Sequence, residues 1–99
     1  MSVKKSPVDV RSMFLLKDQF VDVRGISLCL RRPSVLDFIA AIEFSKKCPD
    51  HFSAWLVWQH LHQSTLPVFS SLEEVLTCDV SLVNEIAENI EKLYGEGKH

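Results

Sequence analysis

Residues 28–44, LCLRRPSVLDFIAAIEF, change from the pattern of a strand to the pattern of a helix. Leu28 and Leu30 alternate with Cys29, which is the period of a half-buried strand. After Arg32-Pro33 the apolar residues recur at the i, i+3, i+4 and i+7 spacing of an amphipathic helix. We expect this second set to face the core: Val35, Phe38, Ile39 and Ile42.

The joint between the two patterns carries its own signals. Pro33 removes a backbone donor and favours extended geometry at the residue before it, so the strand ends there. Ser34 suits a helix N-cap, and Asp37 stands at the position of a capping box, with aspartate in place of the usual Glu or Gln. Lys46-Lys47 favour the carboxyl end of the helix dipole, so the helix should end near them, before Cys48-Pro49.

Upstream, the chain alternates again. Val21 and Val23 flank Asp22, and Arg24-Gly25 supplies a turn whose glycine can adopt positive φ. We therefore predict a β-hairpin over residues 19–31. Periodicity does not decide between strand and helix for residues 13–18.

Downstream, residues 51–62 form a predicted helix, capped by Asp50, that is apolar on nearly every side. A helix of this kind is either buried or bound to something else, and a chain of this length offers few elements to surround it. We therefore expect one side, with Trp55, Trp58 and Leu61, to contact another chain. The alternative is that both tryptophans form the core of a small domain.

Two further helices are predicted in the last third of the chain. Ser70 or Ser71 caps a short helix through LEEVL. Asp79 caps the last helix, and we expect Gly95 to end it in the left-handed conformation. The apolar face of that helix comprises Leu82, Val83, Ile86, Ile90, Leu93 and Tyr94. The expected fold is α+β but mostly α: one small domain over residues 13–94, with about four helices and an N-terminal hairpin, between a flexible arm (1–12) and a flexible tail (95–99).

Length and charge narrow the class of protein. The 99 residues suffice for one small domain, and no apolar run is long enough to cross a bilayer. The net charge of −2 divides unevenly, with +3 over residues 1–50 and −5 over residues 51–99. This division suits head-to-tail self-association or two different partners, or it is an accident of a small sample. The pI of about 6.0 argues against a nucleic-acid binder. We expect no membrane association and a cytoplasmic location.

Signatures of catalysis and metal binding are missing. His60 and His62 stand at i and i+2, so they point to different sides of a helix, and we expect both to be partly exposed. The glycines form no phosphate-binding loop, and no nucleophile motif is present. We therefore predict no enzyme activity, no cofactor and no metal. Arg31 and Arg32 are either solvated residues at the end of a strand or a basic lip that binds an acidic segment of a partner or of a second copy.

The arrangement of these signals resembles a known family. A hairpin with glycine at its turn leads into I-x-L-x-L-R-R-P-S-V-x-D (Ile26 to Asp37), and an S-L-E-E-V segment (71–75) precedes a last amphipathic helix. This pattern, over residues 19–94, is similar to the tail assembly chaperones of tailed bacteriophages. The resemblance implies a non-enzymatic protein that binds the tape-measure protein in the host cytoplasm during tail-tube assembly and leaves before the virion is complete.

The predicted function is therefore that of a tail assembly chaperone. Its predicted contacts are Trp55, Trp58 and Leu61 through apolar surface and Arg31 and Arg32 through charge. The tape-measure protein or another tail protein is the expected partner, and a homo-oligomer is a further possibility. Two alternatives are a structural or adaptor protein of the tail and a small DNA-binding regulator.

Overall fold

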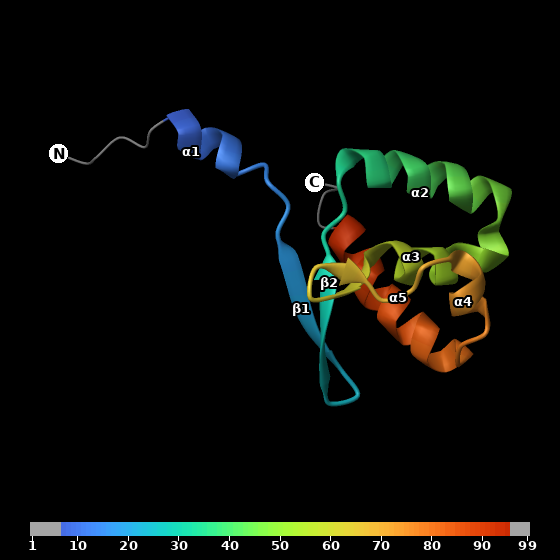
Figure 1. Cartoon of the computed structure of the whole chain (residues 1–99). Helices are drawn as coiled ribbons and strands as arrows, with labels where there is room; N and C mark the ends of the chain where they lie inside the picture. The colour runs from blue at the N-terminus through green and yellow to red at the C-terminus, as the bar shows by residue number, and fades with distance from the viewer. Residues whose placement is uncertain (1–6, 96–99) are drawn as a thin grey trace.

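An antiparallel sheet and a set of helices share the described part of the chain, residues 7–95 of a computed structural model (Figure 1). The strands are β1 (Asp18–Val23), β2 (Ile26–Arg31), β3 (Leu61–Gln63) and β4 (Leu66–Pro67), in the spatial order β1-β2-β3-β4. The helices are α1 (Pro7–Ser12), α2 (Val35–Lys47), α3 (Phe52–His60), α4 (Leu72–Leu76) and α5 (Val80–Gly95), with a 3₁₀ turn, η1 (Pro49–His51), before α3. The mixed α+β class is confirmed, but residues 7–95 hold five α-helices rather than four.

The predicted hairpin is confirmed as β1 and β2. Val23 pairs with Ile26, and both turn residues have positive φ, 53° at Arg24 and 80° at Gly25. Two successive left-handed residues make the tight turn that matches the twist of antiparallel strands. The guanidinium of Arg24 donates to Glu85 Oε1 at 2.9 Å and to Ser81 Oγ at 3.0 Å, so the tip of the hairpin is fixed to α5.

The sequence led us to expect a hairpin alone, but the sheet continues beyond it. Leu61 and His62, which we assigned to the end of a helix, begin β3, and β4 follows at Leu66–Pro67; His62 pairs with Cys29 of β2. Their turn consists of Ser64 and Thr65, with φ of 53° and 68°. Positive φ is uncommon outside glycine and strained for a β-branched residue. Because the turn contains no glycine, it left no sign in the sequence.

Four of the predicted helix ends are confirmed, and the predictions for Asp50 and Gly95 are wrong. Ser71 caps α4 by accepting from the Glu74 amide, and Asp79 Oδ1 accepts from the amides of Ser81 and Leu82 at the start of α5. α2 runs from Val35 to Lys47 as expected. Asp50, however, lies inside η1 and does not cap α3, whose N-cap position makes no side-chain hydrogen bond. Gly95 remains helical and does not adopt positive φ.

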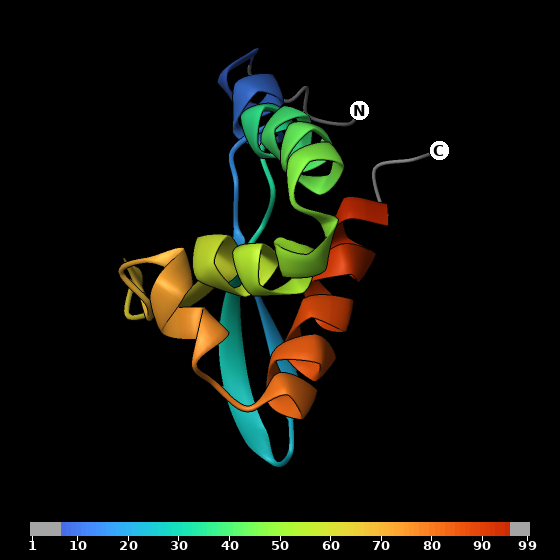
Figure 2. The same cartoon turned by 90° about the vertical axis from the view of Figure 1, so that its right-hand side faces the viewer.

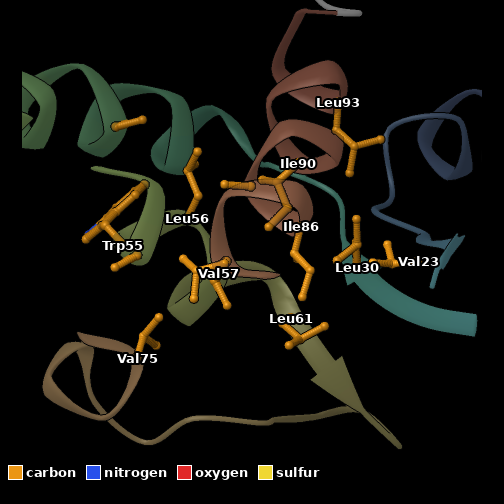
Figure 3. Packing of buried hydrophobic residues seen from close by; sticks show 14 residues of the cluster. Val23, Leu30, Trp55, Leu56, Val57, Leu61, Val75, Ile86, Ile90 and Leu93 are labelled. Atoms are coloured by element: carbon orange, nitrogen blue, oxygen red, sulfur yellow. The ribbon is translucent and has the colours of Figure 1, made fainter. Parts of the chain in front are cut away.

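The core is centred on α3. Figures 1 and 2 show α3 crossing the middle of the domain with α5 beside it, α4 next to it and the sheet on its other side. Figure 3 shows side chains from all these elements meeting around α3. The buried apolar set is Val23, Leu30, Ala41, Ala54, Trp55, Leu56, Val57, Leu61, Val75, Val83, Ile86, Ala87, Ile90 and Leu93. The inner surface of α5 and the missed strand β3 help provide the burial that α3 needs.

The N-terminal segment changes structure before β1. Residues 7–12, which we assigned to a flexible arm over 1–12, form α1, while residues 1–6 and the tail after Gly95 lie outside the described residues. Residues 13–18 are mostly neither strand nor helix, because hydrogen bonds from Met13, Phe14 and Leu15 turn back to α1 and β1 begins only at Asp18. Among the described helices, none has the length and hydropathy required to cross a bilayer.

Candidate functional site

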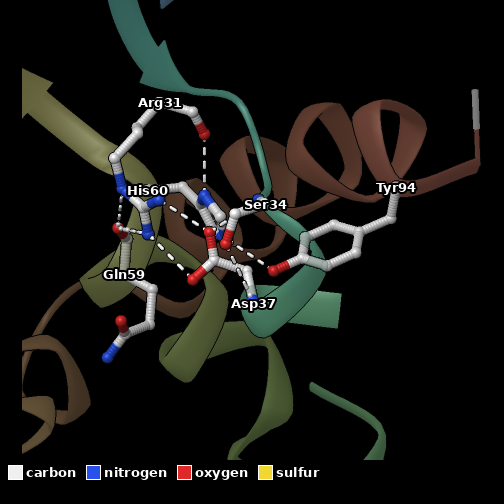
Figure 4. A network of polar contacts seen from close by, with 6 residues as sticks. All are labelled: Arg31, Ser34, Asp37, Gln59, His60 and Tyr94. Atoms are coloured by element: carbon white, nitrogen blue, oxygen red, sulfur yellow. Dashed lines mark hydrogen bonds and ion pairs between the residues drawn. The ribbon is translucent and has the colours of Figure 1, made fainter. Parts of the chain in front are cut away.

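A polar network joins four elements at the start of α2 (Figure 4). Arg31, the last residue of β2, pairs with Asp37 of α2, with Nη1 2.6 Å from Oδ2. The same guanidinium donates from Nη2 to the carbonyl of Gln59 at the end of α3, at 3.0 Å. The Asp37 carboxylate also accepts from the Ser34 amide at 2.8 Å, while Ser34 Oγ accepts from the Asp37 amide at 3.0 Å. The predicted capping box is confirmed, and Arg31 ties it to α3.

His60 is the buried member of this network. Its side chain is fully buried, which contradicts the expectation of a partly exposed histidine. Nδ1 lies 2.7 Å from the carbonyl oxygen of Arg31, which only accepts, so Nδ1 carries the proton. Nε2 then accepts from the hydroxyl of Tyr94, 2.6 Å away on α5. Burial lowers the pKa of His60 to about 4, so the ring is neutral at pH 7.

The protonation states of Asp37 and Tyr94 are consistent with a neutral His60 and with its hydrogen bonds. Burial alone would raise the pKa of Asp37, but hydrogen bonds from Arg31 and from the Ser34 amide outweigh it and lower the pKa. Burial raises the pKa of Tyr94, which keeps its hydroxyl protonated to donate to His60. The network therefore holds one ion pair and one neutral histidine, and it fixes the first turn of α2 to β2, α3 and α5.

The other end of α2 is held by aromatic packing. The rings of Phe44 and Trp55 stack with centroids 5.5 Å apart, and Phe52 stacks on the same indole at 6.0 Å. The amide of Cys48 donates to the carbonyl of Phe44 at 2.8 Å and closes the helix before η1. α2 is thus attached at both ends, and between them only Ala41 is buried.

An apolar surface remains on the helix between these attachments. We call it the α2 face, and it comprises Val35 (77% exposed), Leu36 (77%), Phe38 (41%), Ile39 (49%) and Ile42 (42%). Four of these residues are the stripe that we expected to face the core, so that prediction is wrong. The reason is that α3 and α5 fill the core between them and leave α2 resting on their outer side. Contiguous exposed apolar surface of this kind marks interaction sites in soluble proteins.

A groove runs along one side of the α2 face. Its two hollows, of about 240 and 470 Å³, adjoin at Phe38 and Tyr94, whose rings stack at 6.4 Å. Val35 and Ile42 line it from α2, while Phe52 and Leu56 of α3 form part of its floor. We call this the α2 groove, and its remaining lining residues are Pro33, Ser34, Ala41, Ser45, Glu91, Leu93 and Gly95.

The structure separates the predicted contact residues into three kinds. Trp55 and Leu61 are both 7% exposed and belong to the core. We expected their side chains to be open to another chain, but the fold covers most of their surface. Trp58 is half-buried against that core. Arg31 serves the network described above, and Arg32 donates to Gln19 Oε1 at 3.0 Å. The role of these residues in partner binding remains a prediction, and none of them lies on the α2 face.

Sequence reasoning missed the α2 face, although one signal of it was present. Leu36 and Phe44 stand beside the expected stripe and widen it, so α2 has more apolar surface than one contact with a core requires. Only the position of α3 shows which part of that surface is left over. Within residues 7–95, no group of three or more His, Cys, Asp or Glu side chains is placed to hold a metal ion.

Comparison with known proteins adds no assignment to these observations. No protein-family model matches the chain, and no significant match is found among curated proteins or solved structures.

Proposed function

We propose that this protein is a non-enzymatic binding protein whose α2 face covers apolar helical surface of another polypeptide during its assembly. The observation that carries the proposal is the α2 face itself, a row of large apolar side chains between two firm attachments. Its stripe has the helical spacing that packs well against a second amphipathic helix. An exposed apolar helix that is attached at both ends offers the surface that such a chaperone requires.

The client that fits best is a tape-measure protein, as in the tail assembly chaperones that the sequence resembles. A long helical protein exposes apolar stripes until the tube encloses it, and these stripes would otherwise aggregate. The exposed helix of this chain supports a protein client over DNA, because the side chains that α2 offers outward are mostly apolar, with Lys46 and Lys47 only at its end.

Co-expression with a tape-measure protein tests this proposal. We expect the chain to raise the soluble yield of the tape-measure protein and to co-purify with it. Leu36→Glu and Ile39→Glu should abolish both effects, because each places a charge in the buried centre of the contact. Both positions are exposed, so the variants should melt like the unmodified protein.

Leu66→Glu is the matched control, since Leu66 is 67% exposed but lies on β4, away from α2. It should retain full chaperone activity. Equal yields with and without the chain, or equal activity of the Ile39 variant and the control, would rule out the α2 face as the client site.

A further inference from the structure

A second uncovered apolar surface lies at the other end of the molecule. Residues 10–16, which we call the apolar segment, carry five large apolar side chains that are at least half exposed: Val10 (55%), Met13 (79%), Phe14 (80%), Leu15 (59%) and Leu16 (50%). Figure 1 shows α1 standing clear of the folded body, on the side away from α2. The segment therefore has apolar side chains that its own domain does not cover.

The apolar segment has the form of a helical ligand. α1 ends at Ser12, but hydrogen bonds from the amides of Met13, Phe14 and Leu15 to the carbonyls three residues before them continue the helical turn. Val10, Met13 and Phe14 stand at i, i+3 and i+4, so they share one face once the helix extends through Phe14 on binding. Residues 7–15, which comprise α1 and the turns after it, span about 14 Å when they form one continuous helix. The part of α2 from Val35 to Ser45, which lines the α2 groove, has about the same length.

The charges of the two surfaces are also complementary. Residues 1–17 contain four Lys or Arg and one Asp, with Arg11 and Lys17 directly beside the apolar residues. α5 forms one wall of the groove, and the charged residue in the groove lining is the acidic Glu91. Complementary charges of this kind orient an apolar segment and speed its docking.

We propose that the apolar segment of one copy binds as a helix in the α2 groove of a second copy. The contact places the basic segment of one copy beside Glu91 of the next copy and covers exposed apolar side chains of both surfaces. It occupies one side of the α2 face, so a client has to compete with it. Self-association then protects the free protein from unspecific aggregation, and the client releases it.

The mass of the full-length protein in solution, measured by light scattering after size exclusion, tests this contact. We expect a mass above that of one chain that rises with concentration. The double variant Met13→Ser/Phe14→Ser should elute with the mass of a single chain. Phe20→Ser is the matched control, because Phe20 is 66% exposed on β1 outside the segment, and it should associate like the unmodified protein.

A labelled peptide of residues 7–17 then locates the site on the second copy. It should bind the full-length double variant, and Ile42→Glu in that background should weaken binding about tenfold or more, because Ile42 lines the groove. Each of three results would overturn the proposal. The unmodified protein could have the mass of a single chain, the double variant could still form an oligomer, or the peptide could bind equally well with and without Ile42→Glu. None of these measurements involves a client, so their failure leaves the proposed function to its own test.

Discussion

α2 and α3 are neighbouring helices, both rich in apolar residues, with opposite places in the fold. α3 has apolar residues on almost every side, and it is the centre of the core. α2 has the one-sided stripe of a helix that packs on a core, and most of that stripe is exposed. The sequence led us to the reverse assignment, with α2 packed inward and α3 open to a partner.

The difference shows what a hydrophobic pattern determines and what it does not. A helix that is apolar all round needs neighbours on every side, and α3 obtains them from β2, β3, α4 and α5. Once α5 has packed on α3, little core surface remains for α2. The hydrophobic pattern of a helix therefore indicates how much apolar surface the helix has. Whether that surface is buried within the same chain depends on how the other elements pack.

The contrast in burial can be tested with the same substitution in each helix. Leu56 of α3 is fully buried, and Leu36 of α2 is 77% exposed. Leu56→Ala should reduce the free energy of unfolding by about 2–5 kcal/mol, because it removes buried methyl groups and leaves a cavity. Leu36→Ala should change it by less than about 0.5 kcal/mol. Urea denaturation of both variants measures the two effects, and similar losses would contradict the contrast between the helices.

The network that joins the two helices should make stability depend on pH. The folded-state pKa of His60 is lowered to about 4 from the ordinary value of 6.5, so folding favours the neutral ring. The resulting stabilisation is fully present above about pH 6.5 and is lost as the pH falls towards 4. Between pH 7 and pH 5 the free energy of unfolding should fall by about 2 kcal/mol.

His60→Gln is the control for this dependence. Glutamine can donate to the Arg31 carbonyl and accept from Tyr94 without titrating. The variant should show a much flatter profile between pH 7 and pH 5, whatever its stability at pH 7. An unchanged slope in urea denaturation would assign the dependence to another group.

Some elements of the fold and of the site were predictable from the sequence, and others were not. The hairpin, the capping box at Ser34 and Asp37, and both ends of α2 were predictable, because local backbone chemistry sets them. β3 and β4 were not, because their turn at Ser64-Thr65 lacks glycine and β3 follows directly from α3. The partners of His60 were also hidden, since Arg31 and Tyr94 are distant in the sequence and meet only in the fold.

Tyr94 offers a smaller change to the same network. Tyr94→Phe removes the hydroxyl that donates to His60 Nε2 but keeps the ring that stacks on Phe38. A buried acceptor without its donor should cost about 1–2 kcal/mol of unfolding free energy. The pKa of His60 should rise because Nε2 becomes available to a proton, and NMR titration of its ring protons measures this. A stability equal to that of the unmodified protein would show that the hydrogen bond contributes little.

The smallest expected effect concerns the opening of α2 alone. A helix with little buried surface opens locally at a lower free energy than the whole domain, so α2 amides should exchange with deuterium faster than those of α3. Ser34→Ala removes the side-chain cap and should cost about 1 kcal/mol. Exchange in α2 should therefore accelerate about fivefold, while α3 keeps its rate if it exchanges through a separate opening. Ser71→Ala, which removes the matching cap of α4, is the control and should leave α2 unchanged. Equal acceleration in α2 and α3 would mean that the two helices open together, and α2 would then be part of the core's cooperative unit rather than a platform attached at its ends.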